Sequence, residues 1–201
     1  MLDKAAQTFL RPVMVRTARV LCRLGVTANA LSWTGFVLGM GAAVSIGTGH
    51  FLAGLALLLA SRLMDGLDGA VARATQPTDR GGFLDITLDF VFYASIPLAF
   101  AVADPDANAL AAAVLLASFI GTGSSFLAFA IVAEKRQLQS LAFPDKSFYF
   151  LGGLTEATET LAAFVAMCLW PHWFAEIAYG FAALCVITTA LRIGWGYATF
   201  R

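Results

Sequence analysis

Six long apolar runs, each about as long as a bilayer is thick, dominate this sequence of 201 residues. A transmembrane helix needs about 20 mainly apolar residues, and the runs lie near 30–47, 51–73, 83–103, 108–133, 148–170 and 174–198. Only 13% of the residues are charged, about half the share that is usual in soluble domains. The sequence therefore predicts an all-α integral membrane protein with six transmembrane helices in a single domain, 1–201.

The first 26 residues have a different pattern. Apolar residues recur there at helical spacing, and four arginines lie between them: Arg11, Arg16, Arg19 and Arg23. This pattern is typical of an amphipathic helix on a membrane surface, although a short basic leader before the first span fits it equally well. We expect an N-terminal amphipathic interfacial helix in 1–26 and a six-helix bundle in 27–201.

Basic residues collect in alternate connections. The N-terminal arm holds five Lys and Arg residues, the 73–80 connection two and the 134–147 connection three, whereas the connections near 48, 105 and 172 hold none. Because cytoplasmic loops carry an excess of Lys and Arg, both termini are predicted to be cytoplasmic. The net charge is zero, so the total charge indicates no nucleic-acid partner, and membrane lipids are the expected surroundings.

Four aspartates lie inside two of the predicted spans. Asp65 and Asp68 share a helix face in one span, and Asp85 and Asp89 share a face in the next, because their spacings are three and four residues. The connection between the spans is short, so the two acidic faces are expected to meet. Carboxylates that converge inside a bilayer need positive charge among them, and oxygen ligands suit Mg²⁺ or Mn²⁺, as one or two ions. Pairing with the two arginines of the same helix is the structural alternative, but two cations do not neutralise four acids.

Small and basic residues follow toward the cytoplasmic end of the same hairpin. Gly69 and Ala72 lie on the acidic face and leave room for a ligand, and Arg73 at the rim suits phosphate. Thr78 and Gly81 in the following turn offer a hydroxyl and a backbone donor. The combination predicts a site for a phosphate-bearing ligand that enters from the cytoplasm.

Together these residues form the pattern D-x-x-D-G-x-x-A-R-(x7)-G-x-x-x-D-x-x-x-D from Asp65 to Asp89. The pattern resembles the signature of the class I CDP-alcohol phosphatidyltransferases, and every fixed position is present. The resemblance implies metal-dependent transfer of a phosphatidyl-type group from a CDP-linked lipid, commonly CDP-diacylglycerol, to the hydroxyl of a small alcohol, with release of CMP. It also implies a homodimer in the cytoplasmic (inner) membrane, with an active site that faces the cytoplasm.

Carried over by position, the resemblance implies a role for each residue of the signature. Asp65, Asp68 and Asp85 would ligate metal, and Asp89 would act as a general base that can also touch a second metal. The predicted nucleotide and substrate site comprises signature residues and one residue at the start of the first span: Asn29, Gly69, Ala72, Arg73, Thr78 and Gly81. Ala28, directly before Asn29, replaces a proline that is usual nearby in the family.

The acceptor alcohol is less constrained. Family members with phosphorylated acceptors often carry a basic residue directly after the fourth aspartate, and Phe90 at this position disfavours an inositol-phosphate or glycerol-phosphate acceptor. The acceptor-binding candidates lie in the last two spans: Tyr149, Glu156, Glu159 and Arg192. The two glutamates would share a helix face, and would either favour a cationic or polyhydroxyl acceptor or pair with an arginine across the bundle. Arg192 would bind phosphate or pair with a glutamate.

Two other classes of function fit parts of the pattern. A small divalent-cation transporter also carries acids inside the membrane, but its site is typically near the midplane between inverted repeats, and the sequence shows neither feature. A catalytically silent lipid- or nucleotide-binding membrane protein is the third class. The presence of all four acids with Gly69 and Arg73 disfavours it.

Overall fold

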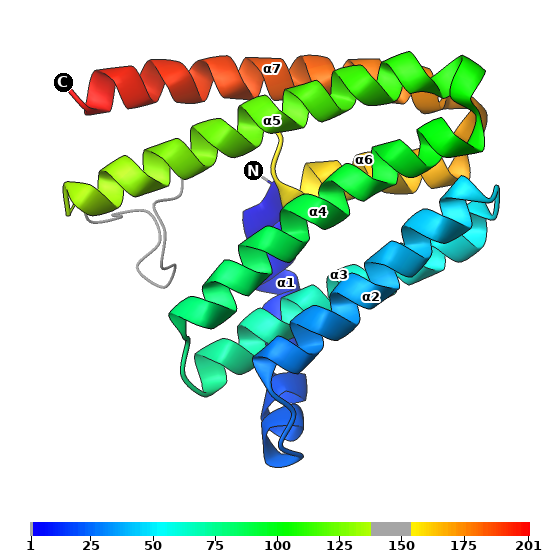
Figure 1. The fold of residues 1–201 in the computed structure, drawn as a ribbon. Coiled ribbons are helices and arrows are strands. Elements are labelled where there is room, and N and C mark those ends of the chain that lie inside the picture. The colour runs from blue at the N-terminus through cyan, green and yellow to red at the C-terminus, as the bar shows by residue number, and fades with distance from the viewer. Residues whose placement is uncertain (1, 138–153) are drawn as a thin grey trace.

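The computed structural model describes residues 2–137 and 154–201, and these form helices with no strand among them (Figure 1). The elements in chain order are α1 Leu2–Arg23, α2 Ala28–Gly47, α3 Phe51–Ala74, α4 Asp79–Ala103, α5 Pro105–Lys135, α6 Ala157–Leu169, the short 3₁₀ helix η1 Pro171–Trp173 and α7 Phe174–Thr199. Four segments are long and apolar enough to cross a membrane: α2, α4, α5 and Pro171–Thr199, which contains α7. The predicted all-α membrane fold is confirmed at this level.

The helices α3 and α6 fall outside that group for different reasons. α3 has 24 residues, but its second half carries four charged side chains: Arg62, Asp65, Asp68 and Arg73. α6 has 13 residues because it begins at Ala157, and part of the predicted span 148–170 lies outside the described residues. The count of six spans therefore stays a prediction.

Side-chain caps explain where two helices near the acidic residues begin. Thr27 Oγ1 accepts a hydrogen bond from the N–H of Ala30 at 3.2 Å and starts α2. Thr78 Oγ1 accepts one from the N–H of Gly81 at 3.1 Å, so α4 begins at Asp79. Such caps satisfy N–H groups that have no partner within the helix. The apolar pattern placed the start of this span near 83 because the first residues of α4 are polar.

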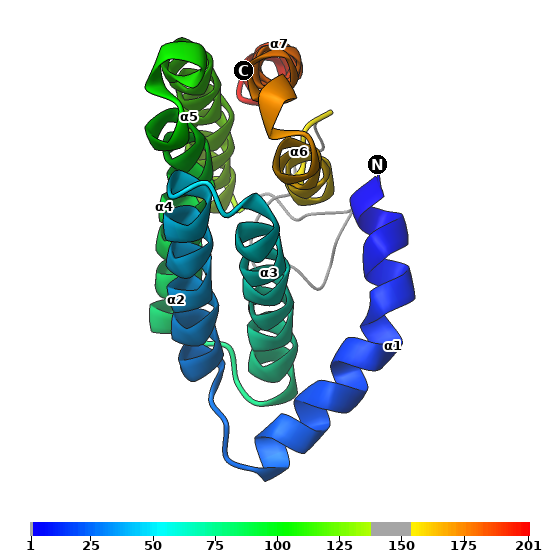
Figure 2. The ribbon, with the colours of Figure 1, turned by 90° about the vertical axis from the view of Figure 1, so that its right-hand side faces the viewer.

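The helix α2 packs against both α3 and α4, α4 also packs against α5, and α5 lies along α7 (Figure 2). Two glycines of α2 permit its close approach, since a Cβ at Gly39 would collide with the Phe92 ring of α4 and one at Gly35 would lie 3.2 Å from the Ser61 carbonyl of α3. Small residues allow this kind of helix contact in membranes. The two helices that carry the aspartates are thus joined through α2 and do not pack directly against each other along their lengths.

The apolar core is built by all the helices from α2 to α7. Fully buried phenylalanines dominate it, and the rings of Phe100 and Phe174 stack with their centroids 4.6 Å apart. Figure 1 shows the α2–α3, α4–α5 and α6–α7 connections at one end of the bundle, while the α3–α4 connection, the end of α5 and the C-terminus lie at the other. The 75–78 connection, with Arg73 and Arg80 beside it, and the basic end of α5 at Lys135 therefore share one end.

Candidate active site

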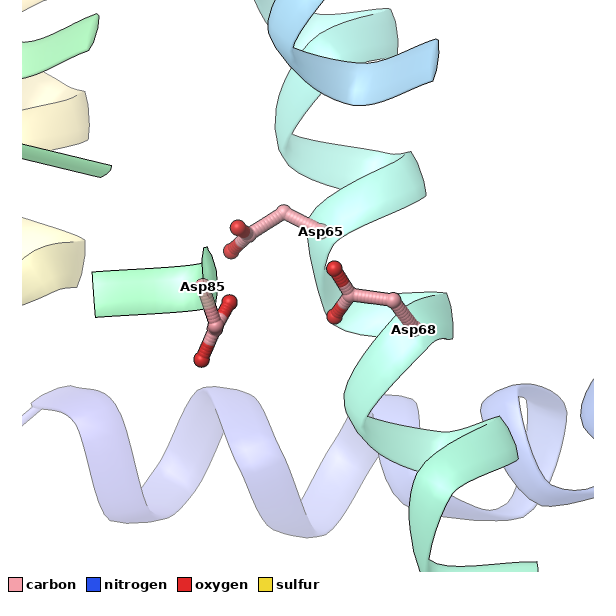
Figure 3. Close-up of side chains that lie close together, drawn as sticks. All are labelled: Asp65, Asp68 and Asp85. Atoms are coloured by element: carbon pink, nitrogen blue, oxygen red, sulfur yellow. The ribbon is translucent and has the colours of Figure 1, made fainter. Parts of the chain in front are cut away.

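Three of the four aspartates converge in the space between α3 and α4. Asp65 and Asp68 project from α3 toward Asp85 of α4 (Figure 3), and one carboxylate oxygen of each lies within 4.8 Å of the other two. Asp68 is 5% exposed, whereas Asp65 and Asp85 are only partly buried. The predicted meeting of the two acidic faces is therefore present for these three residues.

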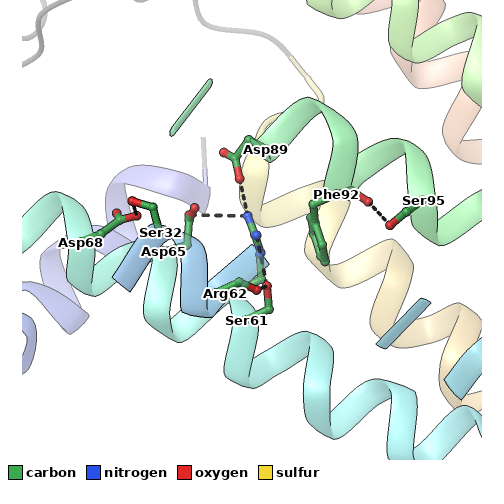
Figure 4. A network of polar contacts seen from close by, with 9 residues as sticks. Ser32, Ser61, Arg62, Asp65, Asp68, Asp89, Phe92 and Ser95 are labelled. Carbon is green, nitrogen blue, oxygen red and sulfur yellow. Dashed lines mark hydrogen bonds and ion pairs between the residues drawn. The ribbon is translucent and has the colours of Figure 1, made fainter. Parts of the chain in front are cut away.

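Asp89, the fourth aspartate, has a different partner. Its Oδ1 lies 2.7 Å from Nη1 of Arg62, and the same Nη1 lies 3.5 Å from Asp65 Oδ2 (Figure 4). The Arg62 side chain is 11% exposed. An arginine thus neutralises part of the acidic site from within, a role that the sequence offered only as an alternative to metal binding. In the sequence, the one feature that indicates this ion pairing is the three-residue spacing of Arg62 and Asp65, which puts both side chains on one face of α3.

Ser32 of α2 contributes a contact that the sequence analysis missed. Its Oγ donates a hydrogen bond to Asp68 Oδ2 at 2.6 Å, in the range of charge-assisted bonds. Ser32 Oγ also lies 3.2 Å from the carbonyl of Ala28, one turn earlier in α2. Because α2 packs against α3, this hydroxyl fixes the orientation of the Asp68 carboxylate. Three helices line the small pocket at the site: Ser32, Gly35, Phe36, Arg62, Asp65, Asp85, Leu88 and Asp89.

Part of the predicted nucleotide site forms a rim beside the aspartates. A Cβ at Gly69 would lie 3.3 Å from Nη1 of Arg73, so the exposed Arg73 guanidinium lies next to the bare backbone of α3. A Cβ at Gly81 would lie 3.3 Å from the side-chain oxygen of Asn29 and 3.1 Å from the hydroxyl of Thr78. The start of α2 and the start of α4 therefore meet at this rim.

Ala72 completes the set of small residues. It is partly buried in the last turns of α3, between Gly69 and Arg73 in the sequence. The structure thus places all six predicted nucleotide-site residues near the ends of α2, α3 and α4 that adjoin the 75–78 connection.

The described part of the chain does not bring the four acceptor candidates together in one place. Tyr149 lies outside the described part of the chain. Glu156 is the N-cap of α6, and its backbone N–H donates to Glu159 Oε2 at 3.1 Å, as in a capping box. The two glutamates therefore lie together at the start of α6, which begins at Ala157, and their expected contact with the acceptor stays a prediction.

Arg192 of α7 is buried and faces α5. Its Nη1 donates to the carbonyl of Thr122 at 3.0 Å, and its guanidinium lies 5.8 Å from the Phe126 ring centroid. Both contacts are structural and link α7 to α5, while the pairing of Arg192 with a glutamate stays a prediction. Phe90 packs its ring against Gly123 of α5, so an apolar contact occupies the position after the fourth aspartate.

The donor set of the three-aspartate cluster fits a hard divalent cation. Carboxylate oxygens are the ligands that Mg²⁺ and Mn²⁺ prefer, and Mg²⁺ in particular usually keeps several positions for water and substrate phosphates. The partial exposure of Asp65 and Asp85 leaves one side of the cluster open to such ligands. Three acids that meet inside a membrane protein are otherwise costly, so the arrangement indicates a cation-dependent function.

Comparison with known proteins connects this geometry to a family. A family model described as CDP-alcohol phosphatidyltransferase matches residues 25–193. Inner membrane protein YnjF of Escherichia coli (strain K12) is 50% identical over 201 residues, which cover 100% of this chain and 98% of that protein. Archaetidylinositol phosphate synthase of Methanothermobacter thermautotrophicus is 43% identical over 81 residues, or 39% of this chain and 42% of that protein.

Solved structures share the fold. The crystal structure of Mycobacterium tuberculosis phosphatidylinositol phosphate synthase (PgsA1) with CDP-DAG bound matches with a TM-score of 0.73 and 21% identity over 92% of this chain and 94% of that chain. The same protein in complex with manganese and citrate matches with a TM-score of 0.70 and 22% identity over 92% and 88%. Because the family model covers most of the sequence and the signature residues converge in space, this chain belongs to the CDP-alcohol phosphatidyltransferase family.

Proposed function

We propose that this protein transfers a phosphatidyl-type group from a CDP-linked lipid of the CDP-diacylglycerol class to the hydroxyl of a small alcohol and releases CMP. The observation that carries the proposal is the convergence of Asp65, Asp68 and Asp85 within 4.8 Å beside the rim of Gly69 and Arg73. Family membership supports the reaction class. The CDP-DAG in the PgsA1 structure supports a lipid of this kind as the donor.

Asp65, Asp68 and Asp85 would hold Mg²⁺ or Mn²⁺, and the manganese complex of PgsA1 supports this assignment. When bound, the ion would neutralise negative charge on the diphosphate and on the leaving CMP. Ser32 would keep Asp68 oriented for this role through its 2.6 Å hydrogen bond.

The rim residues would hold the cytidine diphosphate. Arg73 presents a guanidinium that can donate two parallel hydrogen bonds to phosphate oxygens. Gly69 and Ala72 add little bulk beside it, which leaves space for the diphosphate against α3. Asn29, Thr78 and Gly81, which lie together where α2 and α4 begin, would contact the rest of the nucleotide.

Asp89 would act as the general base. Its Oδ1 is held by Arg62 at 2.7 Å, which leaves Oδ2 to take the proton of the acceptor hydroxyl. The hydroxyl oxygen would then attack the phosphorus that carries the lipid, while the bond from that phosphorus to the CMP oxygen breaks and CMP leaves with the bonding electrons. A carboxylate fixed beside the reacting hydroxyl is the usual arrangement for general base catalysis.

The acceptor would be an alcohol without a phosphate group. This proposal rests on Phe90, whose ring packs against Gly123 where a basic residue would otherwise be available to an anionic acceptor. Two related proteins are named as synthases of inositol phosphate lipids, so inositol phosphate belongs in the acceptor screen. The candidates for acceptor contacts stay Tyr149, Glu156, Glu159 and Arg192. For Arg192, a structural role is the alternative.

We further propose six spans in one domain of 201 residues, with α1 lying at the membrane surface and both termini in the cytoplasm. The α3–α4 connection and the basic end of α5 lie at one end of the bundle, which supports this orientation because positive loops stay on the cytoplasmic side. The E. coli relative named as an inner membrane protein supports the location. The active site would then open toward the cytoplasm, and the protein would form a homodimer, as the family resemblance implies.

The decisive experiment measures CMP released from CDP-diacylglycerol by the purified protein in mixed micelles with Mg²⁺ or Mn²⁺, one acceptor at a time. The acceptors are glycerol, inositol, serine and ethanolamine, together with glycerol 3-phosphate and inositol 1-phosphate. Acceptor-dependent and metal-dependent CMP is the expected result. Absence of CMP with every acceptor, in a preparation that binds CDP-diacylglycerol, would instead favour the silent binding protein, and Mn²⁺ uptake by proteoliposomes would favour the transporter.

A further inference from the structure

Arg62 is anchored by contacts with α4 and with Ser61 of its own helix, and Ser61 is in turn held by α2. Its guanidinium carbon lies 3.8 Å from the centroid of the Phe92 ring of α4, and Nη2 donates to Ser61 Oγ at 3.2 Å. Ser61 Oγ in turn donates to the Gly35 carbonyl of α2 at 2.7 Å. A guanidinium stacked on an aromatic ring and held by hydrogen bonds has one preferred position. Arg62 therefore stays on the Asp89 side of the site.

This position of Arg62 explains why Asp89 stands apart from the other acids. Asp89 lies one helical turn after Asp85 on α4, so its carboxylate is within reach of the same space. Its Oδ1 instead pairs with Arg62 Nη1 at 2.7 Å, and the three oxygens that lie within 4.8 Å of one another come from the other aspartates.

The balance of charge then limits how many metal ions the site accepts. One guanidinium neutralises one of the four carboxylates, and a divalent ion in the three-aspartate cluster neutralises two more. A second divalent ion would have to compete with Arg62 for Asp89 and would give the site a net positive charge. Without the negative diphosphate of a substrate, the second ion is therefore disfavoured.

We propose that Arg62 is a positioning residue that holds Asp89 outside the metal-ligand set, so that the substrate-free site takes up one divalent ion. Asp89 is thereby kept available to the acceptor hydroxyl. The catalytic half of this inference rests on the proposed function, whereas the metal-binding half does not. The two halves therefore have separate measurements.

The metal-binding half is tested by titrating the purified full-length protein with Mn²⁺ in detergent without nucleotide, and by counting bound ions from the electron paramagnetic resonance signal of free Mn²⁺. The wild type should bind one ion per chain. Arg62→Gln removes the cation from between two carboxylates, so this variant should bind a second ion, or the first ion about tenfold or more tightly. A role of Arg62 in packing alone would leave Mn²⁺ binding unchanged or weaken it.

Three further variants separate the effect of the charge at position 62 from that of a nearby surface charge and from that of Asp89. Arg62→Lys keeps the charge and should bind one ion, as the wild type does. Arg80→Gln removes an exposed charge from the first turn of α4 and should not change the count. Arg62→Gln combined with Asp89→Asn should return to one ion, because the second ion needs Asp89.

The proposal is overturned by two Mn²⁺ ions in the wild type, by unchanged or weaker Mn²⁺ binding in Arg62→Gln, or by a second ion that persists in the double variant. The wild-type count remains decisive even where Arg62→Gln does not fold. The catalytic half is read separately from kcat for CMP release, which should fall about 100-fold or more in Arg62→Gln and recover in part in Arg62→Lys. A protein that releases no CMP but shows the predicted Mn²⁺ pattern would refute the proposed function and leave the metal-binding half intact.

Discussion

Replacing Ser32 with alanine should weaken divalent-metal binding while leaving the fold unchanged. The hydroxyl of Ser32 donates to Asp68 Oδ2 at 2.6 Å, and Asp68 is 5% exposed, so water has little access to replace the lost donor. A hydrogen bond to a charged group contributes about 1.5–3 kcal/mol. Loss of a partner that orients a metal ligand typically reduces affinity by about 10- to 100-fold, which lies in the same range of energy. We expect a loss of about this size for Mn²⁺ in Ser32→Ala.

The assay is isothermal titration of Mn²⁺ into the purified protein, with circular dichroism and the Tm as measures of fold. Thr34→Ala is the matched control, because its hydroxyl lies on the same helix, is exposed and donates only to the carbonyl of Ala30 in its own helix at 2.8 Å. The control should bind Mn²⁺ like the wild type. If Ser32→Ala also binds Mn²⁺ like the wild type, the orientation of Asp68 does not depend on α2 and the reasoning fails.

Other consequences of the structure can be measured directly. Asp68→Asn should weaken Mn²⁺-dependent binding of CDP-diacylglycerol, whereas Asp89→Asn should bind it and release no CMP; equal turnover in Asp89→Asn and wild type would contradict the base assignment. Gly39→Val should lower stability by about 1–3 kcal/mol, because the added side chain collides with α4, while Gly41→Ala, whose Cβ meets its nearest neighbour at 3.6 Å, should keep the wild-type Tm. Thr78→Ala should cost about 1 kcal/mol by loss of the α4 cap, a thermal shift that Thr78→Ser should largely restore.

The parts of the site that could be predicted from sequence are those set by local spacing. Asp65 and Asp68 are three residues apart and therefore share a face of α3, and the short connection to α4 brings Asp85 close. The apolar runs gave the positions of most helices because hydropathy depends on composition over about 20 residues. The beginning of α6 was not predicted, because the apolar pattern continues through the residues before Glu156. In the structure, Glu156 is the N-cap and α6 begins at Ala157.

The contacts that organise the site are not local. Ser32 and Asp68 are 36 residues apart, and Arg62 and Asp89 are 27 residues apart. Which side chains meet depends on how the three helices are rotated about their axes and how far apart they lie. Here the small size of Gly35 and Gly39 sets how closely α2 approaches α3 and α4. Hydrophobic patterns report that a helix has an apolar face but do not report its partner. The division of four aspartates into a cluster of three and an ion pair therefore required the packed structure.

The charged second half of α3 has a consequence for how the chain enters the membrane during synthesis. A charged residue at the centre of an inserting helix costs about 2.5–3.5 kcal/mol, and α3 carries several such residues. We expect α3 to leave the translocon only together with α2, against which it packs most extensively. This coupling can be measured by a membrane-insertion assay on the α3 segment with and without α2. The α3 segment by itself should be translocated across the membrane instead of being inserted into it. The residues that serve the chemistry would then make biogenesis cooperative, with the active site assembled as its helices leave the insertion machinery.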